Sequence, residues 1–318
     1  MAATQNNSYP PLIFNIFKPA RMGSLDVVRH FKRELPGDYG KIGHFGTLDP
    51  FACGMLLIGV SGAARLNEFI HAELPKTYLA IGKLGIETDT GDWEGTIKQR
   101  DDSSYSRDVI GSFSKEFIQE RIDRFHGDYW QTPPIYSATK FQGKALHVWA
   151  REGVEIKKEP VKRHIHHLEV VHFKFPYLSI RTRVSSGTYV RTLFQDIAGE
   201  LGTIGSLIGL KRESLGHLDT DQSLKKNLWP KKSDDVNDVW SKGMKPEDVL
   251  LFPRIELPVE REKAFMNGLS TRLIEPTQAT HAWMMGPDQT NWGLVEQRKG
   301  EWKTLINFRG RLATQNGL

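Results

Sequence analysis

The stretch GHFGTLDPFACGML, residues 43–56, decides the fold of this chain. It holds three glycines, a histidine and an Asp-Pro pair, and its apolar end continues to Val60. Glycine permits close backbone approach, while Pro50 has a fixed φ and favours an extended conformation at Asp49. The stretch therefore predicts a rigid loop that holds the Asp49 carboxylate above a sheet, to which residues 55–60 contribute a strand. Loop physics alone favours a simpler interpretation, in which Asp49 only caps a turn.

The N-terminal half predicts strands and helices around this loop. Residues 12–17 form an apolar run that ends at Lys18-Pro19, which is typical of a strand entering a loop. Ser24 is expected to cap a helix. The apolar face of that helix contains three residues at helical spacing, Leu25, Val28 and Phe31. Residues 78–84 predict a buried strand, and Ser114 is expected to cap a second helix.

A strand, a turn and a helix are predicted further along the chain. Apolar residues alternate with arginine and serine over residues 178–184, which indicates a half-buried strand with a basic outer face. Ser185-Ser186-Gly187 turns the chain. Thr188 is expected to cap a helix whose apolar positions run from Val190 to Leu201.

The pattern changes in the last third of the chain. Residues 219–248 are polar and charged and predict a surface connection with one short helix. Short strands follow, including a hairpin over residues 292–308. We therefore expect a flexible tail at 1–11, a large domain at 12–250 and a small β-rich domain at 251–318.

Composition is that of a soluble globular protein with a modest basic excess. The 318 residues include 43 Lys or Arg and 38 Asp or Glu, which gives a net charge of +5 and permits a polyanionic partner without requiring one. From Lys140 to His167 seven basic residues gather, and a solvated face explains them as well as a phosphate-binding strip does. A lone Cys53, no secretory signal and no long apolar run predict a cytoplasmic protein without a membrane span.

Two other features are weak signals of chemistry. His164, His166 and His167 lack a Cys or acidic partner at ligand spacing, and strand alternation explains them better than a metal does. Asp89 and Asp92 lie in GIETDTGD, which is more simply a hydrogen-bonded turn than a Mg²⁺ site.

The loop at 43–56 resembles the TruB family of pseudouridine synthases, the bacterial tRNA uridine-55 enzymes. It matches the family pattern G-H-x-G-x-L-D-P-x-A-x-G-x-L at every fixed position, although Phe45 and Cys53 stand where the family usually has Thr. More family blocks follow the same order along the chain: Lys18-Pro19, Lys76-Thr77-Tyr78, residues 85–91, residues 125–138, Lys140 with Lys144, residues 186–192 and Leu210-Lys211-Arg212.

This resemblance implies an α+β fold with a large mixed, mostly antiparallel sheet, flanking helices and a small C-terminal β-rich PUA-like domain. Residues 12–250 are then the catalytic domain, and residues 251–318 an RNA-binding module. The implied activity converts uridine 55 in the TΨC loop of tRNA to pseudouridine through a catalytic aspartate and base flipping.

The resemblance also assigns the site residues. Asp49 is implied as the catalytic carboxylate, and Arg191 would pair with it and favour its ionised form. Four residues would surround the extruded base, with Tyr78 stacking on it: His44, Tyr78, Tyr189 and Leu210. Four basic residues are candidates for RNA-backbone contacts: Lys18, Lys140, Lys144 and Arg212.

Isomerisation is redox-neutral and needs no energy input, so we expect neither a metal nor a cofactor. The expected partner is the T stem-loop of tRNA, with no obligate protein partner. Two alternatives stay open. One is an RNA-guided synthase resembling dyskerin-type proteins, which usually carry long Lys-rich tails and a fuller PUA domain. The other is a non-catalytic tRNA-binding or tRNA-folding protein.

Overall fold

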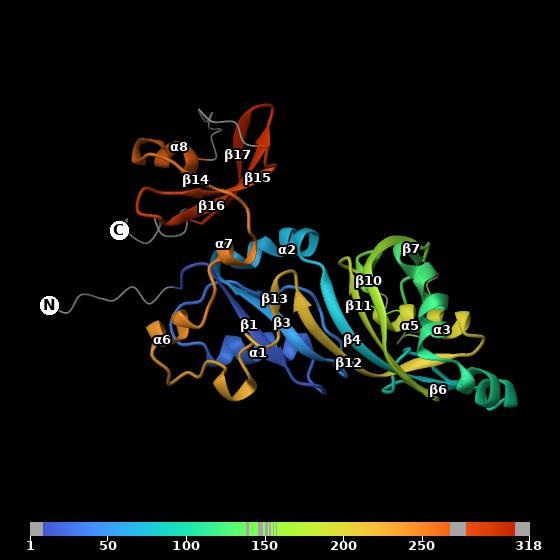
Figure 1. The fold of residues 1–318 in the computed structure, drawn as a ribbon. Helices are drawn as coiled ribbons and strands as arrows, with labels where there is room; N and C mark the ends of the chain where they lie inside the picture. The colour runs from blue at the N-terminus through green and yellow to red at the C-terminus, as the bar shows by residue number, and fades with distance from the viewer. Residues whose placement is uncertain are drawn as a thin grey trace.

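The main feature of the fold is a nine-stranded mixed sheet (Figure 1). The computed structural model describes residues 9–137, 140–145, 149, 152, 154, 156, 158–267 and 278–308. The strand order is β1-β3-β12-β4-β11-β10-β7, with β2 paired to β3 and β13 to β12. These strands are β1 (Leu12–Lys18), β2 (Ile42–His44), β3 (Cys53–Val60), β4 (Lys76–Leu84), β7 (Gly127–Gln131), β10 (Val161–Lys174), β11 (Tyr177–Val184), β12 (Gly205–Leu215) and β13 (Leu218–Asp219). β3 and β12 pair in parallel and the other neighbours in this order are antiparallel, which confirms the predicted mixed sheet.

Helices and two small hairpins complete the α+β fold. The α-helices are α1 (Ser24–Glu34), α2 (Asn67–Glu73), α3 (Lys115–Ile122), α5 (Val190–Glu200), α6 (Val236–Ser241), α7 (Pro246–Val249) and α8 (Glu262–Met266). Short 3-10 or π-helical turns are η1 (Ser61–Leu66), η2 (Tyr105–Val109), η3 (Ile110–Ser112), η4 (Asp123–Phe125), η5 (Lys226–Leu228) and η6 (Val259–Arg261). The hairpins are β5 (Ile86–Thr88) with β6 (Ile97–Arg100), and β8 (Lys140–Phe141) with β9 (Lys144–Ala145). Within the described ranges, none of the helices has the length and apolar character to cross a membrane.

Helix α1 forms where it was predicted, but one turn of its apolar face differs. Val27 is buried, whereas Leu25 is 61% exposed, so the prediction for Leu25 was wrong. The N-cap is Gly23, not Ser24. The Ser24 hydroxyl instead donates to the Leu48 carbonyl at 2.9 Å, and thereby ties the start of α1 to the loop that holds Asp49.

The two other predicted caps had opposite outcomes. Ser114 accepts a hydrogen bond from the Phe117 N–H at 3.1 Å and caps α3 as expected. Thr188 does not cap α5, because its hydroxyl donates to the Ser185 carbonyl at 2.9 Å and Tyr189 takes the N-cap position. The side chain of Thr188 therefore stabilises the turn before the helix.

Residues 219–248 are more than a surface connection. Trp229 and Val239 are buried in the core between α1 and β1. Ile13 and Met244 exchange two backbone hydrogen bonds of 2.9 Å, which adds this segment to the sheet edge. The predicted polar connection thus covers the outer strand of the sheet, with α6, α7 and η5 in it.

The C-terminal residues form a second, four-stranded sheet in the order β14-β15-β16-β17. Its strands are β14 (Arg254–Glu256), β15 (His281–Met285), β16 (Asn291–Arg298) and β17 (Glu301–Asn307). β16 and β17 form the predicted hairpin around Lys299-Gly300. This sheet lies over α2 and α7 (Figure 1). Trp283, Met285 and Phe308 share a buried cluster with Met55 and Leu250, so the two sheets are joined by one apolar core.

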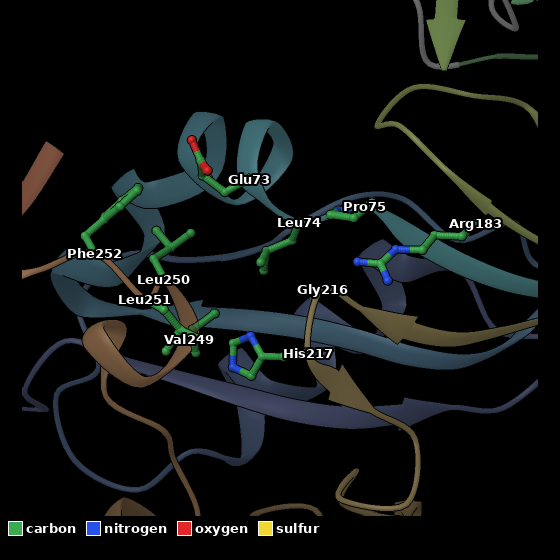
Figure 2. A pocket seen from close by; sticks show the side chains of 10 residues that line it. All are labelled: Glu73, Leu74, Pro75, Arg183, Gly216, His217, Val249, Leu250, Leu251 and Phe252. Atoms are coloured by element: carbon green, nitrogen blue, oxygen red, sulfur yellow. The ribbon is translucent and has the colours of Figure 1, made fainter. Parts of the chain in front are cut away.

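A cavity of about 260 Å³ lies at this junction (Figure 2). The end of α2, the β12–β13 turn and the segment after α7 line it, and Arg183 projects from β11 at one side. Neither Asp49 nor Arg191 lines this cavity.

Candidate active site

The loop that carries Asp49 connects β2 to β3. Pairing of β2 with β3 closes it at its base, where Gly43 lies opposite Gly59. At its tip, the Ala52 N–H donates to the Asp49 carbonyl at 3.1 Å, and the Leu48 N–H donates to the Ser24 hydroxyl at 2.9 Å. The loop is therefore held by its own backbone and by α1.

Lys18 supports this loop from below. It is fully buried at the end of β1, and its Nζ donates to the carbonyls of Met22 and Ala52, both at 2.6 Å, and of Pro50 at 3.4 Å. Burial lowers the pKa of Lys18 to about 8. The structure contradicts the expectation that Lys18 contacts the RNA backbone, because the side chain has no exposed surface and backbone carbonyls occupy its ammonium.

Arg212 holds the other side of the loop and is also fully buried. Its Nε donates to the Met55 carbonyl at 2.7 Å and its Nη2 to the Gly46 carbonyl at 3.1 Å. Gly54 lies against it with a φ of +113°, and a Cβ there would come within 2.3 Å of the Arg212 carbonyl oxygen. Glycine is thus required at this position. The expectation that Arg212 contacts RNA is contradicted for the same reason as for Lys18.

Asp49 and Arg191 form the central ion pair of the site. Arg191 Nε lies 3.1 Å from Asp49 Oδ2, and the side chains are 6% and 34% exposed, respectively. The Nε–H does not point at the carboxylate, so the contact is an ion pair without an aligned hydrogen bond. The Arg191 guanidinium is fixed by donating to the carbonyls of Thr90 and Tyr136. A partly exposed carboxylate therefore stands beside a buried, immobilised cation.

Asp92 is a second carboxylate at this guanidinium. Its Oδ2 lies 3.5 Å from Arg191 Nη1, and the side chain is buried. It accepts hydrogen bonds from the Thr90 hydroxyl at 2.9 Å and the Glu94 N–H at 3.0 Å, which confirms the hydrogen-bonded turn. Burial raises the pKa of Asp92. Sequence reasoning gave Asp92 no role at the site, since nothing local shows that this turn packs on α5.

Two of the three predicted wall residues pack against the loop. Tyr78 in β4 and Leu210 in β12 are buried in the same cluster as Leu48 and Phe51 of the loop. Tyr189 is held through its backbone, because its N–H and C=O both bond the side-chain amide of Gln131. The stacking role of Tyr78 and the wall roles of Tyr189 and Leu210 stay predictions.

His44 begins the loop and is partly buried. Its Nδ1 is buried, and among the described residues it has no hydrogen-bond partner. Burial and the nearby Arg212 lower the pKa of His44, so the neutral imidazole is the form at pH 7. Lys140 and Lys144 lie in β8 and β9, and their side chains are outside the described part of the structure.

Lys76 is a site residue that sequence reasoning missed. It is buried beside Gly46, and its Nζ donates to the Ser186 hydroxyl at 3.0 Å, which also lies 2.6 Å from His71 Nδ1. This network joins α2, the loop and the turn before α5. The signal was present, because strand alternation places Lys76 on the same face as the buried Tyr78.

Lys76→Met is expected to change how stability depends on pH. Burial lowers the pKa of Lys76 from 10.5 to about 7, so between these values the folded state binds fewer protons than the unfolded state. The free energy of unfolding of the wild type should therefore rise with pH in this window, by about 2 kcal/mol from pH 7 to pH 9, relative to the variant. Urea unfolding at both pH values measures this, with Lys98→Met on the exposed strand β6 as control. If the free energy of unfolding changed with pH in the same way for the wild type and Lys76→Met, this prediction would be contradicted.

Comparison with known proteins adds to this geometry. The solved Cbf5-Nop10-Gar1 complex contains a chain that aligns with a TM-score of 0.65 and 19% identity, covering 93% of this chain and 84% of that one. A chain of an H/ACA RNP bound to a substrate RNA aligns with a TM-score of 0.62 and 17% identity, covering 93% and 84%. At such identity the likeness establishes the fold alone.

Proteins found by sequence comparison share a higher identity with this chain. The tRNA pseudouridine synthase B of Clostridium tetani is 32% identical over 299 residues, which cover 92% of this chain and 98% of that protein. The tRNA pseudouridine synthase B of Clostridium kluyveri is 37% identical over 262 residues, covering 82% and 85%. Residues 32–190 match the N-terminal domain of the TruB family pseudouridylate synthases. The chain therefore belongs to the TruB family of pseudouridine synthases.

Proposed function

We infer that this protein converts a uridine of tRNA to pseudouridine, and we propose uridine 55 of the TΨC loop as the target. The contact between Asp49 and Arg191 carries this conclusion. It presents one partly exposed carboxylate, fixed by a buried guanidinium, on the loop with the full family pattern. The similarity to tRNA pseudouridine synthases B over most of their length supports the same reaction.

The reaction needs an anion near C1′ and C6 of the uridine. The N1–C1′ bond breaks, the uracil turns and C5 bonds to C1′. The C5 hydrogen then leaves as a proton, and N1 takes up a proton, so that the product is an isomer of the substrate. Asp49 either stabilises a cationic sugar or forms a covalent adduct, as carboxylates do in glycoside chemistry. Arg191 orients this carboxylate. Because no electrons are gained or lost overall, we expect no metal or cofactor.

The target base has to leave its stack to reach Asp49. We propose that Tyr78 provides the stacking face, that Tyr189 and Leu210 complete the wall and that His44 lies near the extruded nucleotide. Lys140 and Lys144 stay candidates for contacts with the RNA backbone.

The direct test is to map pseudouridine in unmodified tRNA after incubation with the purified protein, with and without EDTA. We expect pseudouridine at position 55 under both conditions, provided that polyamine keeps the tRNA folded. Modification at another position would overturn the assigned target. Activity lost in EDTA and restored by Zn²⁺ but not Mg²⁺ would overturn the metal-free reaction.

An isolated T stem-loop should be an adequate substrate. Sequence-specific RNA recognition usually targets loops whose bases can be splayed out, and the proposed pocket contacts one such base. Single-turnover rates on the stem-loop are expected within about tenfold of those on whole tRNA. An inert stem-loop, with whole tRNA active, would show that recognition requires the rest of the tRNA.

We propose that residues 251–318 form a PUA-like RNA-binding module, that residues 12–250 form the catalytic domain, and that the protein works in the cytoplasm. Deleting 251–318 is a poor test of this assignment, because Met55 and Leu250 would lose their buried partners Trp283 and Phe308. Charge reversal on the exposed Lys303 of β17 tests tRNA binding without opening this core.

The alternatives are less well supported. The RNA-guided interpretation rests on likeness at 17–19% identity, which extends to the fold alone. A non-catalytic tRNA-folding protein would not need the immobilised ion pair of Asp49 and Arg191.

A further inference from the structure

An exposed tryptophan stands beside the catalytic loop. Trp93 is 46% exposed, although indole is among the largest apolar surfaces a side chain can bury. The guanidinium of Arg21 lies over its ring, with the Cζ 5.9 Å from the ring centroid. Arg21 is itself exposed. The pair therefore exposes an aromatic face and a cation side by side to solvent.

Both residues are placed by the loops that position Asp49. The Arg21 N–H donates to the Pro50 carbonyl at 2.7 Å, directly after the catalytic residue. Trp93 follows Asp92, whose carboxylate contacts Arg191. The pair thus bridges the segment after β1 and the turn after β5, on the side of Asp49 where these two segments meet.

The turn that presents Trp93 is rigid. The Thr88 hydroxyl donates to the Asp92 carbonyl at 2.7 Å, the Thr96 N–H donates to the Asp89 carboxylate at 2.8 Å, and the Asp89 N–H donates to the Thr96 carbonyl at 3.0 Å. An exposed aromatic on such a frame loses little conformational entropy when a ligand stacks on it.

We propose that Trp93 and Arg21 form a subsite for one unpaired nucleotide next to the target uridine, with its base stacked on the indole and its phosphate at the guanidinium. This rests on the proposed function. When a base is flipped out, its neighbour loses a stacking partner, and an aromatic face beside the pocket replaces that partner. The adjacent guanidinium adds a cation–π contact and a charge that complements the RNA backbone.

The variants that test this are Trp93→Ala, Trp93→Phe and Arg21→Ala. Two exposed residues provide matched controls. Trp130 is 65% exposed on β7 and points to the sheet face opposite the buried Gln131, so Trp130→Ala removes an indole away from the pocket wall. Arg29 is exposed on α1 and pairs with Asp26, so Arg29→Ala removes a guanidinium elsewhere.

Single-turnover tritium release from 5-labelled uridine in the stem-loop RNA is the measurement. Stacking of one base predicts that Trp93→Ala raises the half-saturating RNA concentration about tenfold, with the rate at saturation changed less than about threefold. Trp93→Phe should recover most of this loss, because it keeps an aromatic face. Arg21→Ala should raise the half-saturating concentration about threefold, and both controls should match the wild type. If Trp93→Ala and Trp130→Ala had the same half-saturating RNA concentration, the proposed subsite would be overturned.

A second readout reports stacking directly. 2-Aminopurine is placed at each unpaired position flanking the target, and binding is followed with the Asp49→Asn variant so that no turnover occurs. Its fluorescence should be quenched at one flanking position, and Trp93→Leu should abolish that quenching. Unchanged quenching in Trp93→Leu overturns the proposal. If the wild-type protein forms no pseudouridine, the proposed function is refuted instead. This outcome distinguishes failure of the proposed function from failure of the proposed subsite.

Discussion

Asp49→Asn should abolish isomerisation, with a rate loss of at least about 10³-fold, while tRNA binding stays within about tenfold of the wild type. The amide has nearly the shape of the carboxylate but cannot act as the anion that the reaction needs. Its neighbours should keep their places, because Lys18 and Arg212 hold the loop through backbone carbonyls and not through the Asp49 side chain. Tritium release and filter binding measure the two quantities.

The control for this experiment is Asp102→Asn. Asp102 is exposed in the segment before η2 and the same chemical change there should leave both quantities unaltered. Release at the wild-type rate by Asp49→Asn would refute the assignment of the catalytic carboxylate. A collapse of binding together with activity would show that Asp49 supports the structure of the loop.

Arg191→Met should have the second largest effect, and it should act on both stability and activity. Removing the guanidinium leaves the buried Asp92 carboxylate without its cation, and breaking such a pair costs about 3–5 kcal/mol of unfolding free energy. It also removes the cation 3.1 Å from Asp49, so the rate on bound RNA is expected to fall at least about 10²-fold. Urea unfolding and single-turnover assays measure the two effects.

The double variant Arg191→Met/Asp92→Asn separates these effects. It no longer carries a buried carboxylate without a partner at position 92, so part of the lost stability should return. Activity should not return, because Asp49 still lacks its cation. Recovered activity in the double variant would mean that Arg191 serves the fold of the turn at Asp92 and not the reaction.

Local patterns determined much of this protein. The loop at 43–56, the alternation over 178–184 and the Ser114 cap depend on neighbouring residues in the chain, and their structures agree with the predictions. The mixed sheet followed from the family resemblance. The position of Asp49 on a loop before a buried strand was also readable, because Gly-rich segments and apolar runs act over a few residues.

Only the tertiary structure decided which cations face outward. In the sequence, Lys18 and Arg212 look like phosphate contacts. In the folded chain, β1 pairs with one edge of β3 and β12 pairs in parallel with the other, so both side chains lie beneath the loop. Their carbonyl partners are up to 34 and 166 residues away in the chain. For Arg191 the family resemblance implied the pair with Asp49, but only the structure showed the contact with Asp92. A side chain's type and spacing are local properties, whereas its burial and its partners depend on strands that meet only when the sheet is complete.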